Sequence, residues 1–216
     1  IDHCNSHSSF KDKVYMSNLC QEITLPTDPI QHIDDADAEI ALCILSAINV
    51  GKVNHIEELE ELCDLAVRGL EELIDYMQYP VKAAERSTHY RRSLGIGYIG
   101  LAHYLAKNKA KYDSPEAFKL VHELTEAFQY YLLRSSNKLA QERGPCEGFQ
   151  QTKYSDGILP IDTYKEDVDG IVPNDLSFDW GSLREDILAD GLRHSTLSAQ
   201  MPSESSSVVS NATNGI

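Results

Sequence analysis

The sequence has no long apolar run and few basic residues. No uninterrupted apolar stretch in its 216 residues approaches the roughly 18 that a membrane-spanning helix needs, and none opens the chain. Only 19 Lys and Arg stand against 34 Asp and Glu, so the basic face of a non-specific nucleic-acid or anionic-membrane binder is missing. We therefore expect a soluble, cytoplasmic protein with no nucleic-acid and no membrane partner, in which a local site holds any phosphate ligand.

Cysteine, glycine and proline are also scarce. The five cysteines are odd in number and widely spaced, which is unlike a disulfide framework and favours a reducing compartment. With 12 Gly, 8 Pro and 25% charged residues, wholesale disorder is excluded. The length predicts one domain over residues 1–216, with enough chain to bury a core.

Motifs for metals and dinucleotides are incomplete. Asp2-His3-Cys4 with His7 offers metal-capable atoms, but the second ligand pair of a closed zinc site is missing. Gly95, Gly97 and Gly100 match the spacing of a dinucleotide fingerprint, yet two arginines and a serine precede them instead of an apolar strand. We predict no metal site and interpret the glycines as helix-packing positions where another backbone comes close.

Helical periodicity and capping residues predict most of the secondary structure. Apolar side chains recur at steps of three and four over 56–77, with the acids from Glu57 to Glu72 on a solvated face. Ser114 and Asp179 are good N-cap residues for two later helices. The predicted helices cover 56–77, a segment from just after Arg92 through Tyr104, 115–143, 180–190 and a short one from 205.

Short apolar segments lie between these helices. Ile40 to Ala47 is typical of a strand buried on both faces, and 192–199 is a second candidate strand. Residues 1–23 are expected to form a loop or short strand before Pro26. Short strands separated by long helices predict an α/β fold with parallel strands.

The first candidate for chemistry is the spacing Asn18-x-Cys20-x-Glu22. In an extended segment the side-chain period is two, so the amide, thiol and carboxylate point to one side. The carboxylate could then move a proton, the amide could orient a hydroxyl, and the thiol could be a nucleophile, metal ligand or radical carrier. A cysteine that only packs, flanked by polar surface residues, is the alternative.

Cys43 and a serine-rich segment near the end of the chain could likewise take part in chemistry or serve only in packing and capping. Cys43 lies in an apolar run, where a thiol is ordinarily inert packing. A serine-rich segment follows a predicted strand and opens a predicted helix, so its hydroxyls and free backbone N–H groups could bind an anion, or could simply cap the helix. This segment comprises Pro202, Ser203, Glu204, Ser205 and Ser206.

Six blocks along the chain, in order, resemble one family. The blocks are Asp2-His3-Cys4-Asn5, Ser17-Asn18-Leu19-Cys20-Gln21-Glu22, Ala41-Leu42-Cys43, Arg91-Arg92-Ser93-Leu94-Gly95-Ile96-Gly97, Gly157-Ile158-Leu159-Pro160-Ile161-Asp162-Thr163-Tyr164, and Met201-Pro202-Ser203-Glu204-Ser205-Ser206 with Ser210-Asn211-Ala212-Thr213-Asn214-Gly215. Together they resemble the catalytic (large) subunit of class I ribonucleotide reductase, which acts on ribonucleoside diphosphates.

The resemblance implies a fold and a set of residue roles. The fold is a ten-stranded α/β barrel of two half-barrels, with a finger-loop region at 1–30 and much of the second half-barrel at 31–216. Cys20 at the loop tip would form a thiyl radical that abstracts the substrate's 3′-hydrogen, inside a dry, enclosed site. Glu22 would be the base, Asn18 would bind the same hydroxyl and Cys43 would be one redox thiol. Leu19, Gln21 and the segment Pro202 to Ser206 would contact substrate, the latter at its diphosphate.

The resemblance also implies partners and missing parts. A metal-containing small subunit would supply the radical, thioredoxin or glutaredoxin would re-reduce the site, and no cofactor would be held by this chain. The full-length protein would be a homodimer whose ATP and dNTP effectors bind outside these residues. The second redox cysteine, the relay tyrosines and the C-terminal cysteines would also lie outside, so we expect an internal piece that is inactive alone.

Two other interpretations are kept. One is a different thiyl-radical barrel with a glycyl-radical loop, such as an anaerobic reductase or a formate lyase. The other is an acidic helical interaction module in which Cys20 and Cys43 are merely buried. The reductase interpretation requires that Cys20 be shielded from water and that it share one nucleotide-sized cavity with Ser203.

Overall fold

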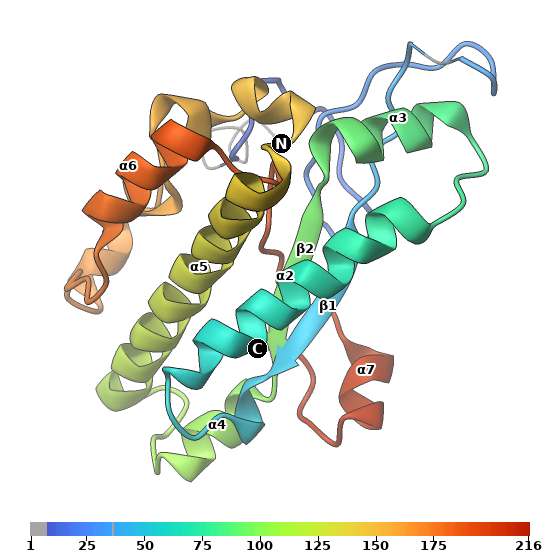
Figure 1. Ribbon diagram of the computed structural model, residues 1–216. Helices are drawn as coiled ribbons and strands as arrows, with labels where there is room; N and C mark the ends of the chain where they lie inside the picture. The colour runs from blue at the N-terminus through green and yellow to red at the C-terminus, as the bar shows by residue number, and fades with distance from the viewer. Residues whose placement is uncertain (1–7, 36) are drawn as a thin grey trace.

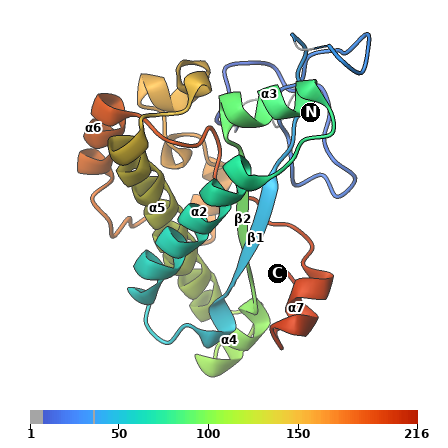
Figure 2. The same ribbon diagram turned by 45° about the vertical axis from the view of Figure 1, so that its right-hand side comes forward.

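Two parallel strands, with helices α2 and α5 on one side and α7 on the other, organise the chain (Figures 1 and 2). The computed structural model describes residues 8–35 and 37–216. Its elements are β1 (Ile44–Asn49), α2 (Glu58–Tyr76), α3 (Lys82–Arg91), β2 (Leu94–Ile99), α4 (Leu101–Lys107), α5 (Pro115–Arg143), α6 (Trp180–Asp190) and α7 (Glu204–Val209), with a 3₁₀ turn before α2 and several between α5 and α6.

The strands pair in parallel, as the sequence predicts. β1 lies beside β2 from Ile44 opposite Leu94 to Asn49 opposite Ile99. The far edge of β2 is bordered by the predicted strand at 192–199, through a parallel bridge between Ile96 and Ser198. This third segment forms only that bridge and a few flanking backbone hydrogen bonds, so the prediction there is confirmed in part.

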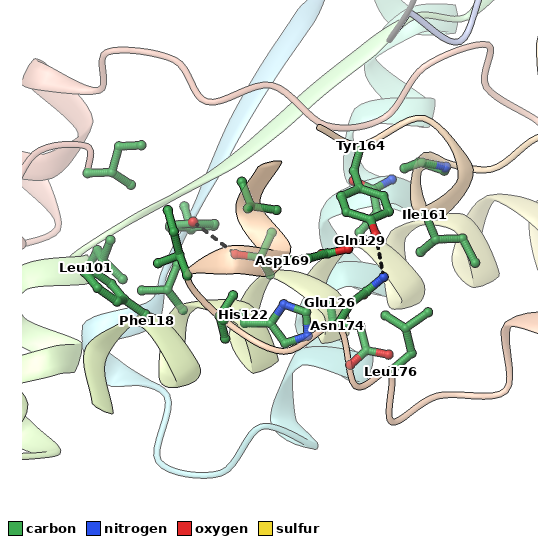
Figure 3. Close-up of a pocket in the computed structure, with 18 of the residues that line it drawn as sticks. Leu101, Phe118, His122, Glu126, Gln129, Ile161, Tyr164, Asp169, Asn174 and Leu176 are labelled. Carbon is green, nitrogen blue, oxygen red and sulfur yellow. Dashed lines mark hydrogen bonds between the residues drawn. The ribbon is translucent and has the colours of Figure 1, made fainter. Parts of the chain in front are cut away.

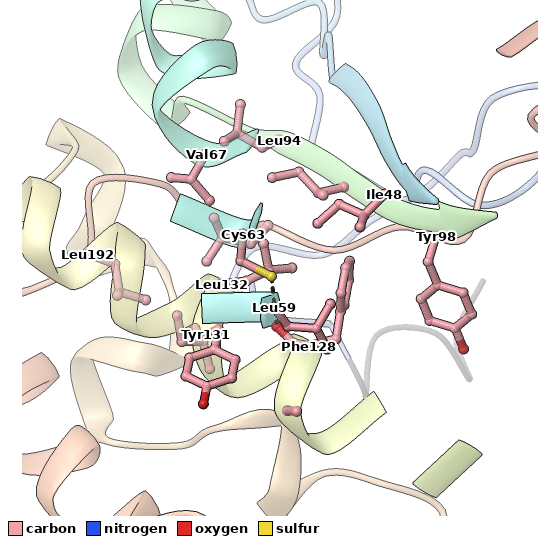
Figure 4. Packing of buried hydrophobic residues seen from close by; sticks show 14 of the residues in the cluster. Ile48, Leu59, Cys63, Val67, Leu94, Tyr98, Phe128, Tyr131, Leu132 and Leu192 are labelled. Atoms are coloured by element: carbon pink, nitrogen blue, oxygen red, sulfur yellow. Dashed lines mark hydrogen bonds between the residues drawn. The ribbon is translucent and has the colours of Figure 1, made fainter. Parts of the chain in front are cut away.

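The core lies between the strands and the two long helices (Figure 4). Because side chains alternate along a strand, Leu94, Ile96 and Tyr98 all point into it. Cys63 of α2 is fully buried in the same cluster, and its thiol contacts the Phe128 carbonyl oxygen at 3.9 Å. The thiol of Cys63 is therefore packing, as its place on the apolar face of its helix predicts.

The capping residues act as predicted. Ser114 Oγ accepts a hydrogen bond from Ala117 N at 3.3 Å, and α5 runs over the predicted range. Asp179 Oδ1 accepts from Ser182 N at 2.9 Å at the start of α6. Each cap satisfies an N–H group that the first helical turn leaves without an internal partner.

The helix predicted from just after Arg92 through Tyr104 is wrong in its first half. Leu94 to Ile99 is strand β2, buried along its whole length, and only α4 beyond it is helical. Gly95 and Gly97 are spaced by two, which places both on the strand face opposite the core. The predicted close approach is nevertheless present, because a Cβ built on Gly97 would lie 2.5 Å from the Ala199 carbonyl oxygen.

Two burial predictions also need correction. The strand expected over Ile40 to Ala47 begins only at Ile44, and Leu45 is 44% exposed, so one face of β1 is open in this chain. Glu71, expected on a solvated helix face, is fully buried. Its carboxylate lies where α2 packs against two arginines and a histidine, a set of partners that the helical period alone does not reveal.

Gly97 is crowded and Gly69 is open, so replacing each by alanine is expected to have opposite effects on stability. We expect Gly97→Ala to lower the free energy of unfolding by about 1–3 kcal/mol, because the added methyl group overlaps the neighbouring backbone. Gly69 lies exposed in α2 with nothing within 4 Å of a built Cβ, so Gly69→Ala is expected to stabilise by about 0.5–1 kcal/mol. Denaturant midpoints of the two variants measure both effects, and equal shifts would contradict the packing of β2.

Candidate functional site

The segment that carries Asn18, Cys20 and Glu22 is a tight turn, not the extended strand assumed from the sequence. Gln21 N donates to Asn18 O at 3.2 Å, and Gln21 has a φ of +66°. Asn18 Nδ2 donates to Glu22 Oε1 at 2.8 Å, and Asn18 Oδ1 accepts from Ile23 N at 3.1 Å. The turn therefore joins the amide and the carboxylate directly and leaves Cys20 at the tip.

The predicted enclosure of this loop is wrong for the structure of this chain. Cys20 is exposed and its neighbour Leu19 is 95% exposed. The side-chain hydrogen bonds of the turn are local, so none of those described within it draws the tip under another element. A dry site for Cys20 requires further protein to cover the loop.

Cys43 lies beside β2 on the face opposite the core. A Cβ built on Gly95 would lie 2.9 Å from Cys43 Sγ, so only glycine leaves room for the thiol there. Burial, with a smaller contribution from the negative charge of Glu22, raises the pKa of Cys43 to about 12. The thiol is therefore protonated at neutral pH, and Glu22 lies within electrostatic range of it.

The serine-rich segment reaches the same face of β2. A Cβ built on Gly97 would lie 2.9 Å from Sδ of Met201, the residue just before this segment. Ser203 N donates to Asn214 Oδ1 at 3.0 Å, and Gly100 N donates to Thr213 O at 2.9 Å. These bonds fix the start of α7 near the carboxyl ends of the strands.

The first turn of α7 has donors to offer. As in any helix, the backbone N–H groups of Glu204, Ser205 and Ser206 have no partner within the helix. Ser203 is buried, whereas Glu204 and Ser205 are exposed. The adjacent glycines of β2 thus place Cys43 and the approach to this serine-rich segment next to each other on one face.

A cavity of about 810 Å³ lies elsewhere, between α5, α4 and residues 160–176 (Figure 3). Its lining is mostly apolar, and the side chains of His122 and Glu126 from α5 reach it. None of the predicted site residues lines it. A single cavity shared by Cys20 and Ser203 stays a prediction.

Sequence reasoning missed a buried cluster of Ser136, His194 and Glu71. Ser136 Oγ lies 2.9 Å from His194 Nδ1, and His194 Nε2 lies 3.0 Å from Glu71 Oε2. The order of groups is that of a nucleophile, base and acid, but all three residues are fully buried, so substrate has no access. The residues lie far apart in the chain, and no local pattern could have grouped them.

Within the described ranges, no group of three or more His, Cys, Asp or Glu could hold a metal ion. The metal-capable residues Asp2, His3, Cys4 and His7 lie outside those ranges. Across the same part of the chain, none of the helices combines the length and apolar character that crossing a bilayer demands.

Comparison with known proteins covers the whole chain. The family model for the ribonucleotide reductase barrel domain matches residues 1–216. The ribonucleoside-diphosphate reductase subunit alpha of Haemophilus influenzae is 58% identical over 219 residues, covering 100% of this chain and 29% of that protein. The reductase 1 subunit alpha of Escherichia coli K12 is 55% identical with the same coverage, and that of phage T4 is 44% identical over 220 residues, covering 100% of this chain and 28% of its own length.

The chain thus spans less than a third of the length of these relatives. Its parallel strands and the glycine face of β2 agree with a barrel domain, whereas the helix bundle that a purely helical module would form is absent from the described residues. The chain belongs to the ribonucleotide reductase barrel-domain family.

Proposed function

We propose that this chain forms part of the active site of a ribonucleoside-diphosphate reductase, which converts ribonucleoside diphosphates to 2′-deoxyribonucleoside diphosphates for DNA precursor synthesis. One observation carries the proposal beyond family membership. Cys43 and Met201, the residue before the serine-rich segment, both pack against the glycines of β2, and Glu22 lies near enough to Cys43 to influence its thiol electrostatically. A thiol, a carboxylate and a candidate diphosphate-binding segment are thereby brought toward one face of the strand.

The residues take separate roles in this reaction. Cys20, as a thiyl radical, abstracts the 3′-hydrogen and returns it to C3′ at the end of the turnover, which regenerates the radical. Glu22 accepts the proton of the 3′-hydroxyl and gives it back in the same turnover. Asn18 donates to Glu22 in the turn and thereby orients its carboxylate. This bond places base and radical residue in one turn, which fixes their relative approach to the sugar.

Cys43 supplies reducing equivalents. The protonated Cys43 thiol and a second thiol from outside these residues give two electrons and two protons, and a disulfide forms between them. The 2′-hydroxyl takes up one proton and leaves as water, and hydrogen replaces it at C2′. Thioredoxin or glutaredoxin then reduces the disulfide. The raised pKa of Cys43 suits this step, because the thiol enters it with its proton.

The serine-rich segment is proposed to bind the diphosphate. The N–H groups in the first turn of α7 have no partner within the helix and could donate to phosphate oxygens, as could the hydroxyls of Ser203, Ser205 and Ser206. Such donors hold phosphate locally in a chain whose net charge is −15. Pro202 and Glu204 set the turn that presents them, and Leu19 and Gln21 of the opposite loop contact the nucleoside.

The remaining parts of the enzyme are proposed from family membership. β1, β2 and residues 192–199 would be strands of a ten-stranded barrel, with residues 1–30 as its finger loop. A metal-containing small subunit would supply the radical, and the full-length subunit would form a cytoplasmic homodimer regulated by ATP and dNTPs.

The direct test is turnover by the full-length protein that contains this chain. With a radical-generating small subunit and a thiol reductant, we expect conversion of CDP to dCDP, and no conversion of any ribonucleoside diphosphate would overturn the proposal. The polypeptide 1–216 alone is expected to be inactive, because Cys20 is exposed to water, which quenches radical chemistry. Measurable dCDP formation by that polypeptide would contradict this expectation.

A further inference from the structure

One buried arginine lies between the loop and the sheet. Arg91, the last residue of α3, is almost fully buried. Its Nε and Nη2 lie 2.7 and 3.1 Å from the two carboxylate oxygens of Glu39, and its Nη1 lies 3.1 Å from Asp12 Oδ2. The rings of Phe10 and Tyr90 lie beside its guanidinium, with centroids at 5.7 and 5.4 Å. The planar group is thus fixed by charge, hydrogen bonds and aromatic contacts.

The two carboxylates come from opposite stems of the loop. The first stem, residues 8–14, precedes the turn and is held near residues 151–153, with Lys11 N donating to Gln151 O at 2.9 Å. The second stem, residues 24–35 and 37–40, follows the turn and is held near α3, with Ile40 N donating to Ala83 O at 3.2 Å. Arg91 is where the two stems meet, because it binds Asp12 of one and Glu39 of the other.

Arg91 is also connected to the face of β2 against which Cys43 packs. β2 begins three residues after it, and Gly95 of β2 touches Cys43. The turn at 17–22 is exposed and makes local bonds, so its direction depends on its stems. Arg91 therefore connects the two stems, through its ion pairs with Asp12 and Glu39, to β2, which follows it closely in the chain.

We propose that Arg91 is a positioning residue that clamps both loop stems and sets how Cys20 and Glu22 approach Cys43. This inference rests on the proposed reductase function. It assigns Arg91 no contact with substrate. Its effect passes through Asp12 and Glu39 to the loop, and a small misplacement of reacting groups is enough to slow catalysis severely.

The neighbouring Arg92 offers a matched control. It is equally buried and binds Glu71 at 2.8 Å and Asp75 at 2.9 Å, but both of these carboxylates lie on α2. Asp12 and Asp75 are both partly exposed, with side-chain exposures of 39% and 49%. Each of the substitutions Asp12→Asn and Asp75→Asn therefore removes one partly exposed carboxylate that pairs with one of two adjacent arginines. Asp12 belongs to the first loop stem, whereas Asp75 belongs to α2.

The experiment compares these two variants in the full-length protein with its small subunit. We expect Asp12→Asn to lower kcat by about tenfold or more with an unchanged KM for CDP. Asp75→Asn is expected to keep the kcat of the wild type, although both variants lose some stability. Arg91→Lys and Arg92→Lys form a second pair, because lysine keeps the charge but lacks the two-pronged geometry.

Hydrogen exchange supplies a readout that does not depend on turnover. In Asp12→Asn, amides of residues 8–14, 24–35 and 37–40 are expected to exchange faster, whereas in Asp75→Asn they keep the wild-type rates. Equal losses of kcat in the two variants would contradict the proposed role of Arg91. Unchanged hydrogen exchange and unchanged kcat in Asp12→Asn would contradict it as well. A wild-type protein without reductase activity would overturn the proposed function instead, and exchange alone would then decide whether Arg91 holds the stems.

Discussion

Cys20→Ser is expected to abolish CDP reduction by the full-length protein while leaving nucleotide binding nearly unchanged. A serine hydroxyl holds its hydrogen too strongly to form the radical that the proposed first step needs. We expect kcat to fall by more than about four orders of magnitude, the scale of loss when a group that forms the reacting intermediate is removed. Because Cys20 is exposed in this chain, the substitution should not disturb folding.

The measurement is dCDP formation together with CDP binding by equilibrium dialysis. Cys146→Ser is the control, since Cys146 is a buried cysteine whose backbone bonds go to Phe149 and Leu192 and not to the turn that carries Cys20. It should retain turnover at a temperature where it is folded. Near-normal turnover in Cys20→Ser would remove the radical role from this residue.

Glu71→Gln is expected to be the most destabilising single substitution considered for this fold. Glu71 Oε1 accepts from Arg193 Nε at 2.7 Å, and Glu71 Oε2 accepts from Arg92 Nε at 2.8 Å and lies 3.0 Å from His194 Nε2. Burial alone would raise the pKa of Glu71, but these hydrogen bonds outweigh it and hold the pKa well below its usual range. Glutamine removes the buried negative charge that Arg92 and Arg193 share and leaves Arg92 with only the partly exposed Asp75, so we expect a loss of about 3–5 kcal/mol.

Glu72→Gln is the matched control, because Glu72 is the next residue and its side chain is 64% exposed. It should change the free energy of unfolding by less than about 1 kcal/mol. Urea unfolding at pH 7 separates the two variants, and equal losses would contradict the buried network.

Acid is expected to reduce the difference in the free energy of unfolding between the wild type and Glu71→Gln. A carboxylate with a lowered folded-state pKa stabilises above the unfolded pKa, about 4.3, and that contribution is lost as pH falls through and below this value. Burial also lowers the pKa of His194, so acid below about 6.5 destabilises the wild type and the variant alike. The advantage of the wild type over Glu71→Gln is therefore lost as the pH falls below about 4.3, where the Glu71 carboxylate of the unfolded chain takes up its proton.

Local patterns predicted the parts of the fold that local physics controls. The bounds of α5 and α6 follow from Ser114, Asp179 and the glycines that end each helix, because capping is decided within a few residues. The strand at Leu94 to Ile99 was missed, since its glycines suit either close helix packing or close strand packing. Only the presence of Ala199 and Met201 beside it decides between the two.

The candidate site, like the fold, could be predicted from the sequence only in part. The identities of Asn18, Cys20, Glu22 and Cys43 could be proposed from the sequence, by resemblance to a family that the comparisons then showed. Their arrangement could not, because a turn with positive φ at Gln21 replaced the assumed extended segment.

The sequence by itself determined the family, the ends of α5 and α6 and the residues available for chemistry, since these depend on residue identity and short-range spacing. The tertiary structure decided which distant groups meet. It buried Glu71 among Arg92, Arg193 and His194, joined the two loop stems at Arg91, and left Cys20 exposed. The physical reason is that burial and ion pairing depend on packing between segments up to 123 residues apart, which no local period encodes.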